Sequence, residues 1–270
     1  MFIGWIRKKS FSLDLEELNS HVAIDKALIT KTFEKNSSLC FGAYKEDKLI
    51  SFISAIELPE SVLINNFYYI KETDSDIKTR LMRLLLNNLS QETKPILFMS
   101  NKDEKELLKD FNFNEYAKFK KAVYSGGAVF NFSNATAKSI NNENFLPVMA
   151  TMDKKAFNED RIEYAKSILL KQSSLVLSTE YGYQHSYAIN KSIIKISPWV
   201  MSSAAFSDAE KMIRGVIYHR GLKKILAFIP SDVEEITNLY KSYKFDLGDE
   251  YSLLYLNSKP SINLEMVYAF

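Results

Sequence analysis

A repeated order of predicted helices and strands is the feature of this sequence that most constrains its fold. In the first half, apolar periodicity predicts helices over residues 21–35, 74–89 and 103–111, and strands over residues 39–44, 49–56, 62–70, 95–100 and 116–124. In the second half, the same patterns predict helices over residues 145–157, 160–172, 207–218 and 232–243, and strands over residues 175–179, 186–189, 192–196, 224–229, 251–256 and 264–270. The order recurs at about half the chain length, which indicates a tandem duplication of one α+β fold, because a solenoid repeats every 20–50 residues or so.

A stretch rich in Gly, Ser and Asn separates the two halves. It covers residues 125–136 and is followed by residues 141–144, a composition typical of a boundary between domains. We therefore predict an N-terminal domain over residues 1–133 and a C-terminal domain over residues 134–270. The total of 270 residues fits two ordinary domains of roughly 100–200 residues each.

Composition and charge exclude several classes of protein. The 18 Phe and 15 Tyr residues, at a formal net charge of +2, exclude a disordered chain. The 35 basic residues are nearly balanced by 33 acidic ones, so we expect neither nucleic acid nor a membrane surface as a partner. The glycine-rich and serine motifs of hydrolases, nucleoside triphosphatases and nicotinamide-binding proteins do not occur in the sequence.

The cysteine and histidine content bears on compartment and metal binding. Cys40 is the single cysteine, which excludes a disulfide within the chain and a thiolate-rich metal site. The apolar residues at the N-terminus precede the first positive charges, the reverse of a secretory signal, and we expect a cytoplasmic protein. His21, His185 and His219 are too scattered to indicate a metal site, so none is expected.

Each half ends in a strand followed by a helix with similar text. Residues 95–101 lead into 107–113 in the first half, and residues 225–230 lead into 238–245 in the second. Both resemble the GNAT superfamily of acyl-CoA N-acyltransferases, in which a strand leads through Asn into a helix ending Leu-Tyr-x-x-x-Gly-Phe. The resemblance covers essentially the whole chain, twice. It implies two α+β domains, each with a mixed, mostly antiparallel sheet flanked by helices.

Neither half keeps the whole motif when the two are aligned on the final Phe. In the first half, the positions of the family's Asn, general-acid Tyr and Gly are held by Asn101, Leu108 and Asn112. In the second half, they are held by Val233, Tyr240 and Lys244. Asn adopts the left-handed conformation of a helix end more readily than Lys does, so the first replacement of Gly is the milder one.

The resemblance also implies a loop that holds the CoA pyrophosphate at the start of a helix, where backbone N–H groups and the helix dipole favour an anion. In the first half this loop is residues 73–78, which contain no glycine and carry the carboxylates of Asp74 and Asp76. In the second half it is the loop of residues 204–209, in which the CoA-binding candidates are Ala204, Ser207, Asp208 and Ala209. Only Asp208 is unfavourable there, so the second half is the better candidate.

The second half further resembles the C-terminal domain of bacterial tandem GNAT proteins. The text from Asp153 to Arg161 matches a helix-pair motif of that domain, with Asn158 in place of Gly. Residues 197–201 match its splayed strand, whose unpaired backbone groups bind the pantetheine arm like an added strand. The resemblance assigns that role to Val200, Met201 and Ser202.

Several candidate residues have a plainer structural reading. Tyr240 is the candidate general acid for the departing CoA thiolate, but it also fits a packing role. Asn101 is interpreted as the N-cap of its helix, with Glu104 completing a capping box. Glu57, Glu180 and His185 lie at strand ends where a general base could stand, but we interpret each of them as a solvated loop residue.

The leading hypothesis is an enzyme that transfers an acyl group from acetyl-CoA or another acyl-CoA to an amine, with CoA held by the C-terminal half. A second hypothesis is a catalytically inactive GNAT-fold protein with a binding or structural role. A third assigns CoA to the first half, with water protonating the thiolate. The amine acceptor is not encoded in any recognisable motif, and a homodimer is left open.

Overall fold

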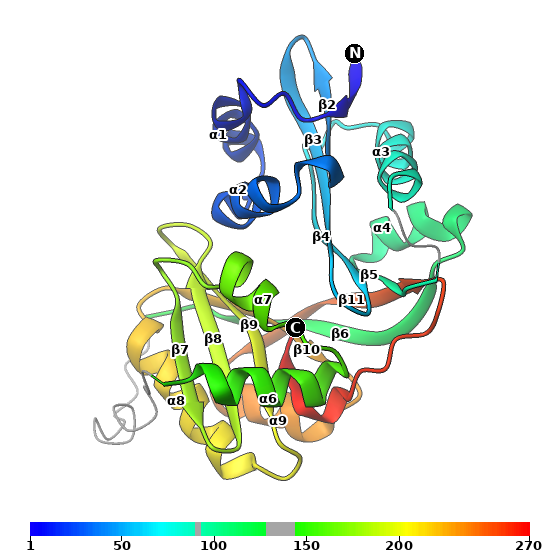
Figure 1. Cartoon of the computed structure of the whole chain (residues 1–270). Coiled ribbons are helices and arrows are strands. Elements are labelled where there is room, and N and C mark those ends of the chain that lie inside the picture. The colour runs from blue at the N-terminus through cyan, green and yellow to red at the C-terminus, as the bar shows by residue number, and fades with distance from the viewer. Residues whose placement is uncertain (90–92, 128–143) are drawn as a thin grey trace. The chain divides into compact units, whose positions relative to one another are not determined.

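The computed structural model describes residues 1–89, 93–127 and 144–270 (Figure 1). It is an α+β protein whose contacts divide the chain into two compact units. Unit 1 comprises Met1–Tyr116, Ser167–Leu169 and Leu253–Pro260, and unit 2 comprises Ala117–Lys166, Leu170–Ser252 and Ser261–Phe270. The predicted domain boundary between residues 133 and 134 lies outside the described residues.

Unit 1 is a sheet with helices on both faces. Its elements are β1 (Phe2–Trp5), α1 (Phe11–His21), α2 (Lys26–Lys35), η1 (Ser37–Leu39), β2 (Cys40–Lys45), β3 (Lys48–Glu57), β4 (Val62–Tyr69), α3 (Ser75–Asn87), β5 (Ile96–Ser100), α4 (Lys102–Leu107) and η2 (Leu108–Phe111). The strand order is β1-β2-β3-β4-β5, followed by the end of β11 (Asp246–Leu256). Strands β1 to β4 are antiparallel, whereas β4 and β5 are parallel.

Alternating side chains of β2 and β3 give unit 1 two cores. Phe41 and Ile53 pack on α3 through Leu81, whereas Cys40 and Phe52 pack under α1 and α2. Figure 1 shows α1 and α2 on one side of these strands and α3 on the other. The alternation follows from the two-residue period of a strand, which points successive side chains to opposite faces.

The prediction of one helix over residues 21–35 was wrong at its start. Helix α1 ends at His21, and α2 begins at Lys26 because the Asp25 carboxylate accepts a hydrogen bond from the Leu28 backbone N–H at 2.9 Å. The apolar spacing of Phe11, Leu15 and Leu18, all buried, explains the additional helix.

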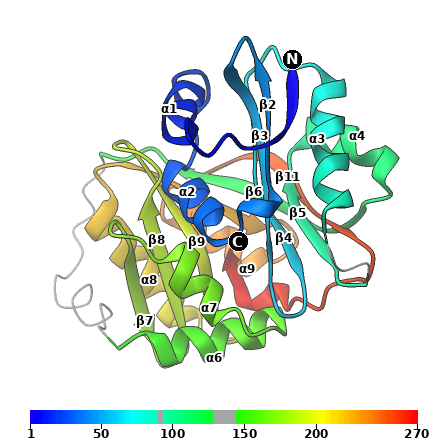
Figure 2. The same ribbon diagram turned by 45° about the horizontal axis from the view of Figure 1, so that its top comes forward.

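Unit 2 repeats the plan. Its elements are β6 (Asn114–Tyr124), α6 (Leu146–Phe157), α7 (Ile162–Tyr164) continuing into η3 (Ala165–Leu169), β7 (Leu175–Thr179), β8 (Gly182–Ala188), β9 (Ile193–Met201), α8 (Phe206–Arg220), β10 (Lys224–Pro230), α9 (Glu234–Ser242), β11, η4 (Leu264–Met266) and β12 (Val267–Ala269). The strand order is β6-β10-β9-β8-β7, and β12 also pairs with β9. Figure 2 shows α6 and α8 on opposite faces of β7, β8 and β9.

The strand that closes each predicted half is built into the other unit. Most of β6 belongs to unit 2, where it runs antiparallel to β10 from Phe119 opposite Pro230 to Tyr124 opposite Ile225. The end of β11 belongs to unit 1, where Leu254 lies in the core with Phe98. The two units therefore repeat the same order of elements, but most of β6 belongs to unit 2 and the end of β11 belongs to unit 1.

The three positions at which Asn or Lys replaces the glycine of the resemblance all keep a left-handed backbone. The φ angles are +60° at Asn112, +51° at Asn158 and +61° at Lys244. Each residue follows the end of a helix, where such a conformation satisfies the last carbonyl groups. The local fold thus keeps the glycine conformation without the glycine.

Candidate functional site

In unit 2, the opening expected to hold the pantetheine arm is filled by the chain itself. Strands β9 and β10 pair in parallel from Ile193 to Lys195, and beyond that point β12 lies between them. Val267 is opposite Val200, and the Phe270 backbone N–H donates to the Phe228 carbonyl of β10 at 2.9 Å. The C-terminus therefore ends beside β9 and β10 (Figure 1).

The backbone groups predicted to bind pantetheine have partners within the protein. Val200 is flanked by Tyr183 of β8 on one side and by β12 on the other, and Met201 lies opposite Gly182. The Ser202 backbone N–H donates to the Tyr181 carbonyl at 2.7 Å. An added strand at Val200 would therefore have to displace β12.

The predicted pyrophosphate loop of unit 2 leads directly into α8. Ala204 has a left-handed backbone with φ of +65°, and Ser207 is exposed in the first turn of the helix. Asp208 and Ala209 are buried, and the Asp208 carboxylate pairs with the Lys211 ammonium at 2.7 Å. The loop has the expected position before a helix, with one neutralised carboxylate beside it.

Tyr240 is a buried side chain of α9. Its hydroxyl donates to the backbone carbonyl of Tyr268, in β12, at 3.1 Å. The ring packs against Trp199 and Phe245, and burial raises the pKa of the phenol well above its usual value. In this structure Tyr240 holds the C-terminal strand.

The corresponding opening of unit 1 has no such strand among the described residues. The parallel pairing of β4 with β5 runs from Val62 opposite Ile96 to Ile64 opposite Phe98. Beyond Ile64, the pairing that the described residues give β4 continues with β3 alone, as far as Tyr69 opposite Ser51. The register with β3 shifts at Asn65, an extra residue that forms a β-bulge where β4 and β5 begin to separate.

Side chains lie at the mouth of the unit 1 opening. The Tyr69 hydroxyl donates to Glu104 Oε1 at 3.3 Å, and the Lys78 ammonium lies 3.8 Å from the centre of the Tyr69 ring. Burial raises the pKa of Glu104 to about 7. The predicted capping box is confirmed, because Glu104 N–H donates to Asn101 Oδ1 and Asn101 N–H donates to Glu104 Oε2, both at 2.9 Å.

The first turn of α3 is the counterpart in unit 1 of the loop before α8. Asp74, Ser75 and Asp76 are all exposed, and the Asp76 carboxylate lies 3.9 Å from Arg80 Nη1. Leu108, at the position of the general-acid Tyr, is buried in the core with α3. Unit 1 therefore offers a helix N-terminus and an open strand side, and no phenol at that position.

The motif from Asp153 to Arg161 forms a buried ion pair. Arg161 Nε and Nη2 donate to the two carboxylate oxygens of Asp153, each at 2.8 Å, and the Tyr183 hydroxyl donates to Asp153 Oδ1 at 2.5 Å. Arg161 also stacks over Phe157. This spacing of Asp and Arg therefore ties α6 to the segment before α7 and to β8.

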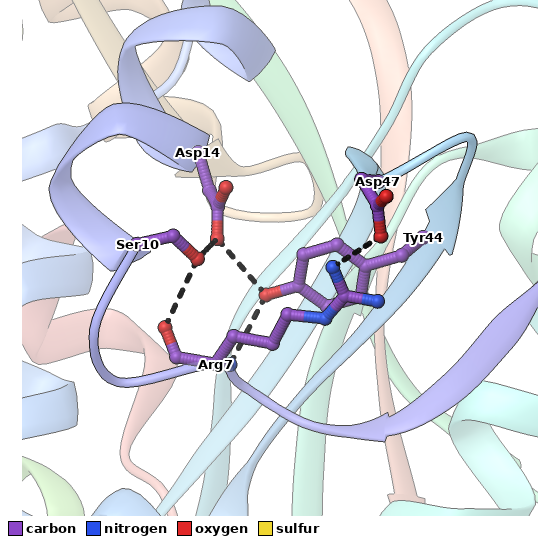
Figure 3. A network of polar contacts seen from close by, with 5 residues as sticks. All are labelled: Arg7, Ser10, Asp14, Tyr44 and Asp47. Carbon is purple, nitrogen blue, oxygen red and sulfur yellow. Dashed lines mark hydrogen bonds and ion pairs between the residues drawn. The ribbon is translucent and has the colours of Figure 1, made fainter.

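A comparable network fastens the segment before α1 to the β2–β3 hairpin (Figure 3). The Tyr44 hydroxyl accepts from the Arg7 backbone N–H and donates to Asp14 Oδ2, both at 3.2 Å, while Arg7 Nη1 pairs with Asp47 at 2.7 Å. Ser10 donates to the same Asp14 oxygen at 2.8 Å. Each of these side chains has a protein partner, which indicates a structural role.

The three candidate bases are not brought together. Glu57 and Glu180 are on the surface, whereas His185 is fully buried. His185 Nδ1 lies 2.6 Å from the Ser197 carbonyl, which can only accept, so Nε2 accepts from Ser174 Oγ at 2.7 Å. Burial lowers the pKa of His185 to about 4, so the ring is a neutral link between strands at pH 7.

Within the described residues, no group of three or more His, Cys, Asp or Glu side chains is arranged to hold a metal ion. No helix in that part of the chain is both long and apolar enough to cross a bilayer.

This chain is similar to known proteins in its structure and not in its sequence. The sequence matches no protein-family model. It also matches no curated protein. A candidate acetyltransferase of Pyrococcus horikoshii superposes with a TM-score of 0.78 at 17% identity, over 99% of this chain and 93% of that one.

Two further solved structures share the fold over nearly the whole chain. A tandem GNAT protein from the clavulanic acid biosynthesis pathway has a TM-score of 0.59 at 7% identity, covering 96% of this chain and 99% of that one. A GCN5-related N-acetyltransferase from Sphaerobacter thermophilus has a TM-score of 0.56 at 9% identity, with 98% of both chains covered. The chain has the fold of tandem GNAT acetyltransferases.

Proposed function

We propose that the protein is an acyl-CoA-dependent N-acyltransferase that transfers an acyl group, most simply acetyl, from acyl-CoA to an amine. The observation that carries the proposal is the unit 1 opening. There the described residues give β4 no partner strand on one side beyond Ile64, Asn65 forms a bulge, and α3 starts beyond the end of β4. The acetyltransferases with the same fold support the reaction class.

In this proposal the pantetheine arm lies along the free side of β4, whose backbone groups bond its amides as an added strand would. The backbone N–H groups at the start of α3, at Ser75 and Asp76, face the pyrophosphate, which the helix dipole stabilises. Lys78 in the next turn adds a positive charge. The carboxylates of Asp74 and Asp76 oppose it, so we expect weak binding of CoA.

The chemical step joins the amine nitrogen to the acyl carbon and breaks the carbon–sulfur bond. The amine loses a proton to water, and the CoA sulfur leaves as a thiolate that takes up one, so the products are an amide and CoA. Because Leu108 is apolar, the proton for sulfur comes from water, and a lost phenol slows this step without preventing it.

The alternative assignment of CoA to unit 2 uses Val200, Met201, Ser202 and the loop from Ala204 to Ala209, with Tyr240 as the acid. It requires β12 to leave β9 and Tyr240 to give up its bond to Tyr268. We therefore favour unit 1 as the CoA-binding unit, with one CoA bound per chain.

A second candidate function is that of a GNAT-fold binding protein without catalysis. The occupied opening of unit 2 and the apolar Leu108 of unit 1 favour it, because Leu108 provides no phenol at the general-acid position and Tyr240 is bonded to β12. The two functions share the fold, but only the enzyme transfers the acyl group to an amine.

The test has two stages. In a thermal-shift titration of the intact protein with acetyl-CoA, CoA and octanoyl-CoA, the proposal predicts a saturable rise in melting temperature. CoA release is then measured by thiol detection with ethanolamine, putrescine, phenethylamine and glycine methyl ester. Amine-dependent release supports the enzyme. Binding without release from any amine supports the non-catalytic protein, and no shift at millimolar ligand contradicts the proposal.

Two matched variants test which unit binds CoA. Ser75 and Ser207 are both exposed in the first turn of a helix, α3 or α8, where a new carboxylate is compatible with the helix dipole but repels a pyrophosphate. The unit 1 assignment predicts that Ser75→Glu abolishes the acetyl-CoA shift and Ser207→Glu preserves it. The reverse result would assign CoA to unit 2.

A further inference from the structure

A cluster of neutral polar side chains, buried except for the half-buried Asn65, lies in unit 1 where β4 and β5 begin to separate. It consists of Thr32 of α2, Ser54 of β3, and Asn65 and Asn66 of β4. Thr32 and Ser54 are fully buried, and Asn66 is 2% exposed. Most buried polar groups in proteins make a hydrogen bond. Each donor and acceptor of this cluster is therefore expected to have a partner.

The hydrogen bonds run in one direction through the cluster. Asn66 Nδ2 donates to Ser54 Oγ at 2.9 Å and to Asn65 Oδ1 at 3.1 Å. Ser54 Oγ donates to the same Asn65 oxygen at 3.0 Å, and Asn65 Nδ2 donates to Thr32 Oγ1 at 2.8 Å. Both nitrogens of the two amides are therefore used as donors within the protein.

One acceptor is left over. Asn66 Oδ1 is buried and has no hydrogen-bond partner among the described residues. Turning the amide over does not remove the problem, because it would bring Asn66 Oδ1 against Asn65 Oδ1, two acceptors that repel each other. While Asn65 Nδ2 donates to Thr32 Oγ1, the oxygen of Asn66 stays unsatisfied, an arrangement that costs free energy unless a donor from outside the protein completes it.

The position of this oxygen connects it to the reaction. Asn65 is the bulged residue, and Ile64 is the last residue of β4 that pairs with β5. Asn65 reaches Thr32 of α2, so the cluster lies on the α2 face of the sheet, opposite the face covered by α3. A donor reaches Asn66 from the α2 side of the sheet. It would therefore enter the opening between β4 and β5 from the face opposite to α3.

We propose that Asn66 Oδ1 binds an N–H of the acceptor amine. The inference rests on the proposed function and adds the recognition of its second substrate. All four side chains are uncharged, so the cluster favours the neutral amine, which is the nucleophilic form, over an ammonium ion. The amine needs an N–H for Asn66 and a lone pair for the acyl carbon, which selects primary or secondary amines and excludes tertiary ones.

The test compares Asn66→Ala with Tyr44→Phe, using acetyl-CoA and the best amine of the panel above. Asn66→Ala removes the free oxygen, and we expect KM for the amine to rise roughly 5–10-fold, the effect of losing one hydrogen bond, with the dissociation constant of acetyl-CoA unchanged. Tyr44→Phe removes a buried hydroxyl from the network of Figure 3, on the same face of the sheet, and leaves all four side chains of the cluster in place. We expect its KM to match that of the wild type.

A second measurement does not depend on the folding of a variant. In the wild-type protein loaded with CoA, the side-chain amide resonances of Asn66 should shift on titration with ethanolamine and stay unchanged with tetramethylammonium, which has no N–H. An unchanged KM in a folded Asn66→Ala variant, or an equal rise in Tyr44→Phe, would overturn the inference while leaving the proposed function intact. Absence of transfer to every amine would overturn both.

Discussion

Replacing Asp153 by asparagine tests the buried ion pair on which unit 2 depends. The carboxylate accepts two bonds of 2.8 Å from Arg161 and one of 2.5 Å from Tyr183, and the two charged side chains are only 7% and 8% exposed. The Asp153→Asn change would leave the guanidinium buried without its counter-charge and turn an amide N–H₂ toward a donor. Breaking such a pair costs about 3–5 kcal/mol, a large part of the roughly 5–15 kcal/mol that stabilises a domain.

Urea unfolding followed by tryptophan fluorescence measures this loss. Trp199 is fully buried in unit 2, whereas Trp5 is exposed in unit 1, so the change in emission on unfolding comes mainly from unit 2. Asp249→Asn is the matched control: its carboxylate pairs with Lys121 at 3.5 Å but is 76% exposed, and we expect a change below about 1 kcal/mol. The double variant Asp153→Leu/Arg161→Met should regain stability relative to either single change. Equal losses in Asp153→Asn and Asp249→Asn would refute the reasoning.

Three further predictions follow from individual contacts. Tyr240→Phe removes the buried bond to the Tyr268 carbonyl and should lower the free energy of unfolding by about 1–2 kcal/mol in urea titrations, with turnover per folded molecule unchanged; a specific loss of turnover would return Tyr240 to the active site. Lys244→Gly should raise the free energy of unfolding by about 0.5–1 kcal/mol, because the relief of strain at φ of +61° exceeds the entropy that glycine adds to the unfolded chain. A loss of stability would show that Lys244 is unstrained in this conformation. The raised pKa of Glu104, about 7 against 4.5, means that the folded state holds a proton that the unfolded state has lost. The stabilisation from this bound proton is therefore full below pH 4.5 and disappears as pH rises through 7. Between those limits the free energy of unfolding of the wild type should fall by about 3 kcal/mol relative to Glu104→Gln. Urea-unfolding free energies that change with pH in parallel for the two proteins would contradict this.

Much of the local structure could be predicted from the sequence, because it depends on neighbours in the chain. The strand β7 was predicted to its observed limits, Leu175–Thr179, from a short apolar run between Ser174 and Glu180. Asn101 and Glu104 stand three residues apart, the spacing of a capping box, and the box is present. The repeat of the element order also indicated two α+β units of one fold.

Pairing partners could not be predicted, because they depend on contacts far along the chain. The segment after Leu264 was expected to be a strand, but nothing in Val267, Tyr268 and Ala269 indicates that it enters the space between β9 and β10. The same holds for the exchange of β6 and the end of β11 between the units. Apolar periodicity identifies strands that will be buried and does not say which strands bury them.

The candidate site was affected by the same limit. The predicted loop at Ala204 and the phenol of Tyr240 are at the ends of helices, as expected, yet the C-terminal strand occupies the place beside them. The unsatisfied oxygen of Asn66 could not be predicted, since it becomes visible only when the partners of Ser54 and Asn65 are known. The polar pair Asn65–Asn66 inside an otherwise apolar and aromatic strand was the one available hint.

The most direct test of the central claim is a crystal structure of the intact protein with CoA. We predict one CoA per chain, with its pantetheine arm along β4 beyond Ile64, its pyrophosphate at the start of α3, and β12 still paired with β9. Density for CoA along Val200 with β12 displaced would contradict the assignment to unit 1. A crystal grown at saturating CoA with neither opening occupied would contradict the account of the protein as an acyl-CoA enzyme.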